Sequence, residues 1–343
     1  WTLMAKATAV NFSGADFVRC GLYDLTHNIT LDGSTYQVGA GIASAGPITN
    51  VATIVVPAAT TVQVQQQCGH DAAAGDSAYL DPDASLVALE TLDGTTAGQS
   101  IARTSAATPL TTTDTTVLSL SLPAGDYAVG FKFTGVTFSG STLVTCALTE
   151  PRGFFGAGLV NVGSATAAAT DAYFTYLSGG GTVSLACRVT SGSGAYLDPA
   201  TVLWARKSTA STAVEGGCGA YLINAKTDLV ALVRGGTQCV IKGGQSTRLS
   251  AAYVPRGTWV AIGGEAEIGN ATATADFVRC EILGNGGHLD GAATWETGNG
   301  YVGLSLLGTL KLKAPATFSE TCTRDITGEL SNSYEGSMVL IKV

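Results

Sequence analysis

A hexapeptide recurs letter for letter at two widely separated places in this chain. It runs from Ala15 to Cys20 (ADFVRC) and returns from Ala275 to Cys280, and a looser third copy (STLVTC) runs from Ser141 to Cys146. Around each cysteine the apolar positions alternate, as Val18-Cys20-Leu22, Val144-Cys146-Leu148 and Val278-Cys280-Ile282. Such alternation is typical of a strand that is buried on one face. The repeat therefore predicts three copies of one β-module, each with a cysteine that faces the core.

Each of these cysteines has a second cysteine at a similar distance along the chain. The separations are 48 residues for Cys20 and Cys68, 41 for Cys146 and Cys187, and 42 for Cys280 and Cys322. We expect one disulfide per module, and the repeat alone selects these pairings among the many that eight cysteines allow. The two remaining cysteines are expected to pair with each other. The predicted disulfide residues are Cys20, Cys68, Cys146, Cys187, Cys218, Cys239, Cys280 and Cys322.

The triplicated pattern also divides the chain into domains. We expect module one at residues 1–92, module two at 112–207 and module three at 247–343, with 208–246 as an insertion that holds the extra disulfide. The insertion contains the run Asp228 to Leu232, which is similar to the closing strand of a module. Two segments therefore compete to close module two.

An aromatic residue opens equivalent strands in the three modules. Tyr127 and Trp259 each follow a Pro-x-Gly turn and another alternating run, whereas Trp1 has neither before it. We expect these aromatics to anchor the core, and module one to lack its first strand. Later in modules one and three, Asp32-Gly33 and Asp290-Gly291 predict tight turns between strands.

Short alternating runs, glycine and proline punctuation and few helix-length amphipathic windows predict an all-β chain. The expected architecture is a series of tandem antiparallel β-sandwich modules with one core disulfide each, and with either jelly-roll or immunoglobulin-like connectivity. The aromatic strand, the Val-x-Cys strand, the second cysteine and the closing strand together resemble tandem disulfide-containing, jelly-roll-like modules of secreted and surface proteins of actinobacteria and of some phage structural proteins. This resemblance implies a fold and a surface location, with no enzymatic role attached.

The composition limits the partners of the chain. Charged residues make up 13 % of it, against about a quarter in an average domain, and 18 basic against 26 acidic residues give a net charge of −8. Without a basic stripe we expect no nucleic-acid partner. No apolar run approaches the length of a membrane helix, so no membrane insertion is expected. Paired cysteines indicate an oxidising location, which is extracellular, on a cell surface or on a virion.

No set of residues suggests catalysis, and we expect no catalytic residue, no metal ligand and no cofactor. Gly75-Asp76-Ser77 resembles the nucleophile block of a lipase family, but no base accompanies it, so it is interpreted as a polar loop. His27, His70 and His288 are expected to lie in loops without metal. Asp81-Pro82-Asp83 supplies two carboxylates, fewer than calcium requires, and is interpreted as a turn.

Two further kinds of motif carry weaker signals. The glycine-rich run from Gly39 to Gly46 has the wrong spacing for a dinucleotide site and is interpreted as a connection between strands. Asn11, Asn28 and Asn270 fit the N-glycosylation rule, which makes a glycan a candidate partner.

These observations predict a non-enzymatic extracellular structural protein. The first hypothesis is a subunit of a surface filament or similar homo-oligomeric assembly, in which a strand from another copy is donated into module one. The alternatives are a phage virion structural protein, such as a head-decoration or tail protein, and a carbohydrate-binding or adhesive surface protein. The residues of the assembly interface are not identified by the sequence.

Overall fold

The fold consists of β-strands joined by turns. The computed structural model describes residues 1–12, 14–38, 45–71, 78–90, 99–138, 140–163, 166–192, 194–208, 221–225, 229–234, 239–270, 275–296, 301–326 and 330–343. There is no helix in these ranges, and thus none of the kind that could span a bilayer. The prediction of an all-β chain with antiparallel sheets is confirmed.

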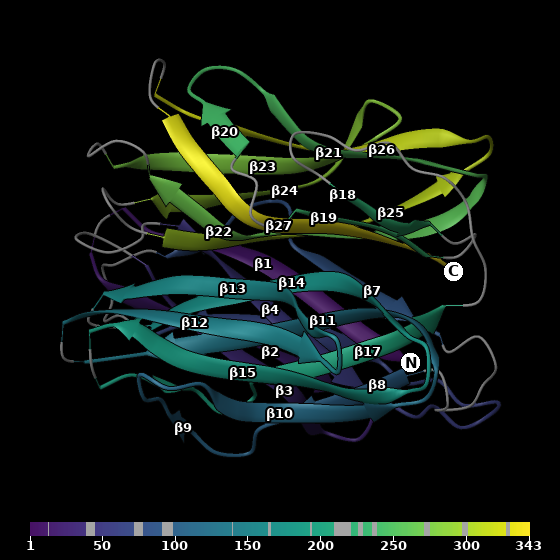
Figure 1. Cartoon of the computed structure of the whole chain (residues 1–343), viewed down its shortest axis with the longest axis horizontal. Helices are drawn as coiled ribbons and strands as arrows, with labels where there is room; N and C mark the ends of the chain where they lie inside the picture. The colour runs from purple at the N-terminus through teal and green to yellow at the C-terminus, as the bar shows by residue number, and fades with distance from the viewer. Residues whose placement is uncertain are drawn as a thin grey trace.

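The strands form six sheets, which combine into three two-sheet sandwiches (Figure 1). In the first sandwich one sheet contains β1 (Thr2–Val10), β4 (Ala45–Thr53), β6 (Tyr79–Leu80) and β7 (Ser85–Leu89). Its second sheet has the order β3-β2-β5, made of β2 (Asp16–Asp24), β3 (Ile29–Val38) and β5 (Val64–His70).

The second sandwich is larger. Its first sheet contains β8 (Gln99–Arg103), β9 (Thr108–Pro109), β11 (Gly125–Val136), β14 (Thr166–Leu177), β16 (Tyr196–Leu197) and β17 (Val202–Ser208). Its second sheet has the order β10-β15-β12-β13, made of β10 (Thr115–Leu122), β12 (Ser141–Glu150), β13 (Gly153–Gly163) and β15 (Gly181–Ser191).

The third sandwich repeats this plan. One sheet contains β18 (Tyr221–Ala225), β19 (Leu229–Arg234), β20 (Cys239–Lys242), β22 (Gly257–Asn270), β25 (Tyr301–Leu312) and β27 (Leu330–Lys342). The other has the order β21-β26-β23-β24, made of β21 (Thr247–Val254), β23 (Asp276–Gly284), β24 (Gly287–Glu296) and β26 (Ala316–Arg324).

The order of the strands identifies the connectivity as a jelly roll. In the second sandwich the sheets run β8-β17-β11-β14 and β10-β15-β12-β13, so the first strand lies beside the last and the second beside the last but one. The third sandwich has the same order, β19-β27-β22-β25 and β21-β26-β23-β24. This wrapping of a double hairpin over two sheets is that of a jelly roll, and it decides between the two connectivities that the sequence left open.

The opening strands extend the second and third sandwiches beyond the expected module boundaries. β8 lies upstream of residue 112 and pairs with β17, while β19 lies within 208–246 and pairs with β27. The strands β18, β19 and β20, which lie within the expected insertion 208–246, are thus hydrogen-bonded into a sheet of the third sandwich. β17 is the strand that closes the second sandwich.

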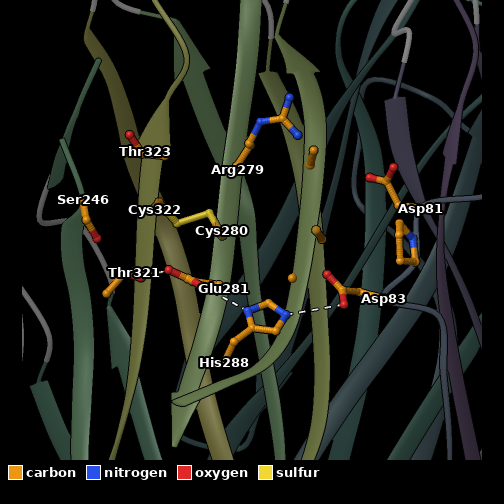
Figure 2. A pocket seen from close by; sticks show the side chains of 14 residues that line it. Asp81, Asp83, Ser246, Arg279, Cys280, Glu281, His288, Thr321, Cys322 and Thr323 are labelled. Carbon is orange, nitrogen blue, oxygen red and sulfur yellow. Dashed lines mark hydrogen bonds and ion pairs between the residues drawn. A yellow bond between two sulfur atoms is a disulfide. The ribbon is translucent and has the colours of Figure 1, made fainter. Parts of the chain in front are cut away.

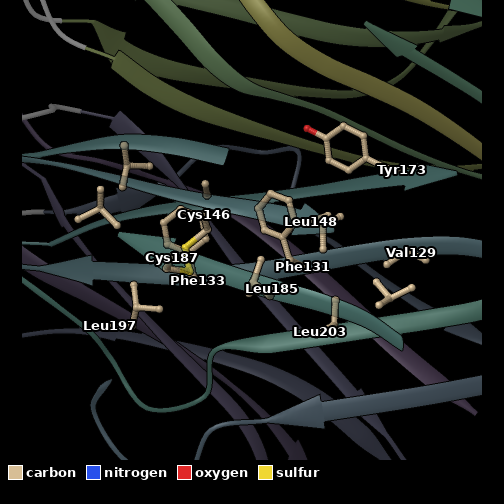
Figure 3. Close-up of a cluster of buried hydrophobic side chains, with 14 of the residues drawn as sticks. Val129, Phe131, Phe133, Cys146, Leu148, Tyr173, Leu185, Cys187, Leu197 and Leu203 are labelled. Atoms are coloured by element: carbon tan, nitrogen blue, oxygen red, sulfur yellow. A yellow bond between two sulfur atoms is a disulfide. The ribbon is translucent and has the colours of Figure 1, made fainter. Parts of the chain in front are cut away.

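The three predicted core disulfides are present in these sandwiches. Cys20 is bonded to Cys68, Cys146 to Cys187 and Cys280 to Cys322, in each case between directly paired residues of neighbouring strands. Figure 3 shows the second of these disulfides within the core of its sandwich, beside the ring of Phe133. Phe131 stacks on Phe133 and on Tyr173. Cys218 lies outside the described residues, and with it the expected pairing to Cys239.

Two of the three strand-opening aromatics are buried as expected. Tyr127 and Trp259 are 2 % and 0 % exposed, and each donates a hydrogen bond to the proline carbonyl of the preceding Pro-x-Gly turn, Pro123 at 3.0 Å and Pro255 at 2.9 Å. The ring fills the core and its polar atom closes the turn, which explains why this sequence unit recurs. Trp1 differs, because it is 38 % exposed.

The first sandwich has an open sheet edge. In the other two sandwiches β10 covers the edge of β15, and β21 covers the edge of β26. Among the described residues no strand pairs with the corresponding edge of β5. The consequence is visible at the disulfide, since Cys187 and Cys322 are buried whereas Cys68 is exposed.

Removal of a core disulfide should therefore cost more in the second sandwich than in the first. Replacing both Cys146 and Cys187 by alanine is expected to lower the free energy of unfolding by about 2–5 kcal/mol, because a cross-link and buried packing are lost together. The disulfide between Cys20 and Cys68 closes a loop of similar length, but Cys68 is exposed. The matched double replacement there is therefore expected to lower the free energy of unfolding by less. Denaturant unfolding followed by fluorescence measures both, and equal losses would contradict the difference in burial.

The three sandwiches surround a shared hydrophobic cluster. It contains Met4, Val51 and Leu89 from the first, Ala128, Ala172, Val202 and Trp204 from the second, and Val260, Leu307, Val339 and Ile341 from the third. Val51, Ala172 and Leu307 occupy equivalent register positions of β4, β14 and β25. Because equivalent positions of three copies meet in one cluster, the sandwiches are arranged around a pseudo-threefold axis. Figure 1 shows the third sandwich (green to yellow) above the second (teal), with the first (purple) behind them.

Candidate functional site

Buried ion pairs join the sandwiches around this axis. Lys6 on β1 reaches into the third sandwich, where its Nζ donates to Asp290 Oδ1 at 3.0 Å and to the Gly291 carbonyl at 2.5 Å. Lys132 occupies the same position on β11, and its Nζ lies 2.8 Å from Asp32 Oδ2 of the first sandwich. All four charged side chains are at most 3 % exposed. Each pair is thus a contact from one repeat to the next, repeated at two of the three junctions.

The aspartates of the two Asp-Gly pairs, which predicted tight turns, instead form these buried ion pairs. Asp32 lies within β3 and Asp290 within β24, and both are 2 % exposed. Besides its lysine, each carboxylate accepts a backbone N–H from the next strand, Val51 at 2.7 Å for Asp32 and Leu307 at 2.6 Å for Asp290. The turn prediction is therefore wrong at both positions. Aspartate is placed in a strand because it neutralises a buried lysine of the neighbouring sandwich.

The third junction uses no such pair. The position of Lys6 and Lys132 is taken by Gly264 on β22, and the position of Asp32 and Asp290 by Gly156 on β13. Both charges are therefore absent together, which avoids a buried charge without a partner. Instead, the single hydroxyl of Ser337 in the third sandwich lies within hydrogen-bond distance of two acceptors of the second, the side chain of Asp171 and the Ala172 carbonyl.

The repeated hexapeptide forms hydrogen bonds and an ion pair with the residues that follow the second cysteine strand. Asp16 accepts the backbone N–H of Asp71 at 3.1 Å, and Arg19 Nε donates to the Asp71 carboxylate at 3.1 Å. In the third sandwich Asp276 accepts the N–H of Ile326, and Arg279 pairs with Asp325 at 2.9 Å. The looser copy has replaced the ion pair by a hydrogen bond between Thr145 and Thr190, 2.7 Å long. The identical Asp and Arg of the two hexapeptides are thus explained by polar contacts within each sandwich.

A cleft of about 430 Å³ opens where the first sandwich meets the outer face of β23, β24 and β26 (Figure 2). One wall is the segment Asp81-Pro82-Asp83 that follows β6, and the floor is formed by side chains of the sheet. The lining residues are Asp81, Pro82, Asp83, Ser246, Arg279, Cys280, Glu281, His288, Gly291, Ala292, Ala293, Thr321, Cys322 and Thr323. Asp81-Pro82-Asp83, which the sequence predicts to be a turn, belongs to the first sandwich and lies against the third.

His288 links the two sides of the cleft. Its Nδ1 lies 3.0 Å from Glu281 Oε2 in the same sandwich, and its Nε2 lies 3.4 Å from Asp83 Oδ1 in the first. Figure 2 shows the imidazole between these two carboxylates. The hydrogen bond to Glu281, and after it the one to Asp83, raises the pKa of His288, although partial burial opposes the shift. Burial raises the pKa of Asp81 on the same wall, and the positive charge of Arg279 counteracts it.

The His288 contact should make the junction of the first and third sandwiches stronger in mild acid. Its folded-state pKa lies above the ordinary value near 6.5, so its contribution is present below that value and disappears as the pH rises through the folded-state pKa. We expect His288→Gln to lower the melting temperature more at pH 5.5 than at pH 8.5. Because the side chain is about half exposed, the effect should be small. Scanning calorimetry at both pH values measures it, and a larger effect at pH 8.5 would contradict the assignment.

An aromatic cluster lies beside the cleft. The ring of Phe277 on β23 packs edge-on against Trp295 on β24, with 4.7 Å between centroids, and against Phe12 of the first sandwich at 5.8 Å. Phe12 also lies 6.4 Å from Tyr79. The guanidinium of Arg279, which lines the cleft, is 5.2 Å from the centre of the Phe277 ring. Phe12 and Tyr79 are 61 % and 49 % exposed, so the cluster presents aromatic surface to solvent.

The other residues that the sequence singled out do not meet at this cleft. His27 pairs with Asp24 at 2.6 Å and His70 with Asp16 at 2.8 Å, both within the first sandwich. In the described part of the chain no group of three or more potential ligands could hold a metal ion. Gly75-Asp76-Ser77 lies outside the described residues, as do residues 39–44 of the glycine-rich run.

The three glycosylation motifs have different environments. Asn11 is fully buried and donates a hydrogen bond to the Gly14 carbonyl, so it is not accessible as an acceptor for a glycan. Asn28 lies in an exposed turn with a positive φ of 56°, which suits an accessible site. Asn270 ends β22, and the next two residues of its motif lie outside the described part of the chain.

Comparison with known proteins gives no family. No family model matches the chain, and no curated protein matches it significantly. Among solved structures, "Life in the extremes: atomic structure of Sulfolobus Turreted Icosahedral Virus" aligns at 10 % identity over 100 % of this chain and 80 % of that chain, with a TM-score of 0.23. "The Triple Jelly Roll Fold and Turret Assembly in an Archaeal Virus" aligns at 11 % identity over 98 % and 79 %, with a TM-score of 0.22.

A third solved structure, "Crystal structure of infectious bursal disease virus VP2 subviral particle", aligns at 11 % identity over 99 % of this chain and 72 % of that chain, with a TM-score of 0.25. At TM-scores this low, the strand order of the chain itself is what identifies the jelly roll. The expected resemblance to actinobacterial surface proteins stays a prediction.

Proposed function

We propose that this chain is a non-enzymatic structural subunit of an extracellular assembly such as a surface filament, and that its first sandwich accepts a β-strand from a neighbouring copy. The observation that carries this proposal is the open edge of β5. Backbone groups at a sheet edge are ready partners for a strand of another chain, and a subunit that exposes such an edge can polymerise through it.

The geometry of the disulfide indicates that β5 is able to accept a strand. The Cα atoms of Cys20 and Cys68 are 4.1 Å apart, a distance typical of residue pairs that exchange no backbone hydrogen bonds. The N–H and C=O of Cys68, and by alternation those of Gln66, therefore point away from β2 and toward the open edge. At the same positions of the other sandwiches, Cys187 and Cys322 are paired with a further strand.

The other two sandwiches define the strand that would fit. β10 places Thr115 opposite Cys187, and β21 places Thr247 opposite Cys322. Further along, apolar residues enter the core, among them Leu120 and Leu122 on β10 and Val254 on β21. The donated strand is therefore antiparallel to β5, with threonine opposite Cys68 and alternating apolar residues beyond it.

The rigid arrangement of the chain supports a building-block role. Three jelly rolls are joined by one shared hydrophobic cluster and by the buried pairs of Lys6 and Lys132, so we expect the subunit to behave as one rigid body. The net charge of −8 and the core disulfides are compatible with a location outside the cell. A virion protein is the alternative assembly, and a micrograph of the native particle distinguishes it from a filament.

Substitution of the β5 edge tests the proposal. Gln66→Pro removes an outward N–H without removing a hydrogen bond to β2, and is expected to abolish concentration-dependent self-association in sedimentation velocity. Gln66→Ala is the matched control, because it equally loses the 3.2 Å contact of the Gln66 side chain with Asn50 but keeps the N–H. Self-association that persists in Gln66→Pro, or a wild-type chain that stays monomeric at all concentrations, would refute strand exchange.

A further inference from the structure

We propose that the cleft between the first and third sandwiches binds a neutral saccharide, with its polar side chains bonding sugar hydroxyls and the neighbouring aromatic cluster packing on a sugar ring. The proposal does not depend on strand exchange, because the cleft lies on β23, β24 and β26, away from the β5 edge.

The polar groups of the cleft match a ligand rich in hydroxyls. Glu281 and Asp83 supply carboxylate oxygens that accept hydrogen bonds, Arg279 donates, and Thr321 and Thr323 can do both. They protrude from two strands and one facing segment into a single opening, as Figure 2 shows for the labelled side chains. Since a sugar hydroxyl both donates and accepts, it can be satisfied by such a mixed set, and bonds to charged groups are the stronger ones.

The aromatic cluster supplies the apolar part of a binding site. Phe12 is 61 % exposed although it packs on Phe277, and Tyr79 beside it is about half exposed. Arg279 connects this surface with the cleft, since it lies over the Phe277 ring and lines the opening. Pockets for small molecules commonly combine aromatic surface with a few convergent polar groups. The C–H faces of a pyranose ring fit an aromatic surface of this kind.

The balance of charge selects against anionic ligands. Asp81, Asp83 and Glu281 line the cleft, whereas Arg279 is already paired with Asp325. An anionic polymer, such as a nucleic acid or a sulfated glycan, would meet three carboxylates, and the two cationic side chains of the cleft, Arg279 and His288, are both already bonded to carboxylates. A neutral saccharide has no such cost.

The equivalent junction of the second and first sandwiches provides an internal comparison. It repeats the aromatic pair as the exposed Phe138 and the half-buried Tyr196, with 6.5 Å between ring centroids. The position of Glu281 is occupied there by Gly21, and the ring of Tyr23 lies over it, with the nearest atoms 2.8 Å from where a Cβ would stand. The carboxylate is missing there and the Tyr23 ring fills its space. Saccharide binding is therefore expected at the junction of the first and third sandwiches and not at the junction of the second and first.

Binding can be tested directly with the purified full chain. Linear oligomers of glucose, mannose, galactose and N-acetylglucosamine are titrated by calorimetry, alongside a sulfated oligosaccharide. We expect saturable binding of at least one neutral oligomer, weakened about 3- to 10-fold by Phe12→Ala and about tenfold or more by Glu281→Gln, since an aromatic contact contributes less than a hydrogen bond to a charged group.

Phe138→Ala is the matched control, because Phe138 is also highly exposed and repeats the position of Phe12 at the second junction. It is expected to leave the affinity unchanged. The proposal is overturned if no neutral oligomer binds at millimolar concentration, if the sulfated oligosaccharide binds best, or if Phe138→Ala weakens binding as much as Phe12→Ala does.

Discussion

Replacing Asp32 by alanine is expected to destabilise the protein by about 3–5 kcal/mol, because it leaves the ammonium group of Lys132 buried without a counter-ion. Lys132 is 3 % exposed at its side chain, and Asp32 receives it at 2.9 and 2.8 Å through both oxygens. Asp32 also accepts Arg103 Nη1 at 2.7 Å and the N–H of Val51. Burial lowers the pKa of Lys132 and the carboxylate of Asp32 opposes this shift, so the ammonium depends on its partner.

A double variant separates the loss of the pair from the exposure of an unpaired charge. Lys132→Met combined with Asp32→Asn removes both charges of the pair but keeps the approximate volume and an acceptor for Val51. Arg103 loses its carboxylate partner in this variant, but it is 27 % exposed and keeps its hydrogen bonds to the Leu31 and Val51 carbonyls. Replacement of both partners of a buried pair is often nearly neutral, so the double variant should be clearly more stable than Asp32→Ala. Urea denaturation of the wild type, Asp32→Ala and the double variant measures the difference. If the double variant loses as much stability as Asp32→Ala does, the unpaired Lys132 ammonium is not the cause of the loss.

The chain itself supplies a natural precedent for this result. At the junction of the second and third sandwiches both positions are glycine, Gly264 and Gly156, and neither charge is present. A Cβ on Gly264 would stand 2.9 Å from Asp171 Oδ1, so the backbone approaches more closely there than a side chain allows. The three junctions thus offer two ways to join the same surfaces, by a buried pair or by close backbone contact.

The sequence predicted the features that lie within one sandwich and recur in all three, namely the cysteine strands and their disulfide partners. Alternation around Cys20, Cys146 and Cys280 predicts strands, and the similar distance to a second cysteine predicts the partner. Both signals depend on one sandwich alone, and the structure places these residues on paired strands. The jelly-roll order could not be predicted, because it depends on which edge each opening strand joins.

The main difference between the predicted and the observed fold concerns the opening strand of the third sandwich. The run Asp228 to Leu232 is similar in sequence to a closing strand, so the sequence assigns it to an insertion or to the end of module two. In the structure Leu229–Arg234 is β19, which lies beside the closing strand β27 in the same sheet. An opening and a closing strand that pair in one sheet can carry similar patterns of residues, so sequence similarity does not distinguish them.

The candidate site was outside the reach of sequence reasoning for a different reason. His288 and Asp83 are 205 residues apart, and each in isolation appeared to be an ordinary loop or turn residue. Only the pseudo-threefold arrangement brings the loop after β6 onto the third sandwich. The ion pairs of Asp32 and Asp290 could not be predicted for the same reason, because their partners Lys132 and Lys6 belong to other repeats.

The shared cluster at the pseudo-threefold axis leads to the second large prediction, for Trp204. This side chain is 4 % exposed and belongs to a cluster formed by all three sandwiches. It fits over Gly130, where a Cβ would stand 2.4 Å from the indole ring. Trp204→Ala leaves a cavity at the axis and is expected to cost about 3–5 kcal/mol. Because the cluster belongs to no single sandwich, the loss should reach all of them.

Hydrogen exchange locates that loss. In Trp204→Ala, amide exchange is expected to accelerate in β4 and β25 of the neighbouring sandwiches as well as in β11 and β17. Trp259→Ala is the matched control, since Trp259 is equally buried but packs within the core of the third sandwich, and its effect should be greatest there. Acceleration confined to the second sandwich in Trp204→Ala would mean that the three jelly rolls are independent, and a rigid subunit could not then be built on their common core.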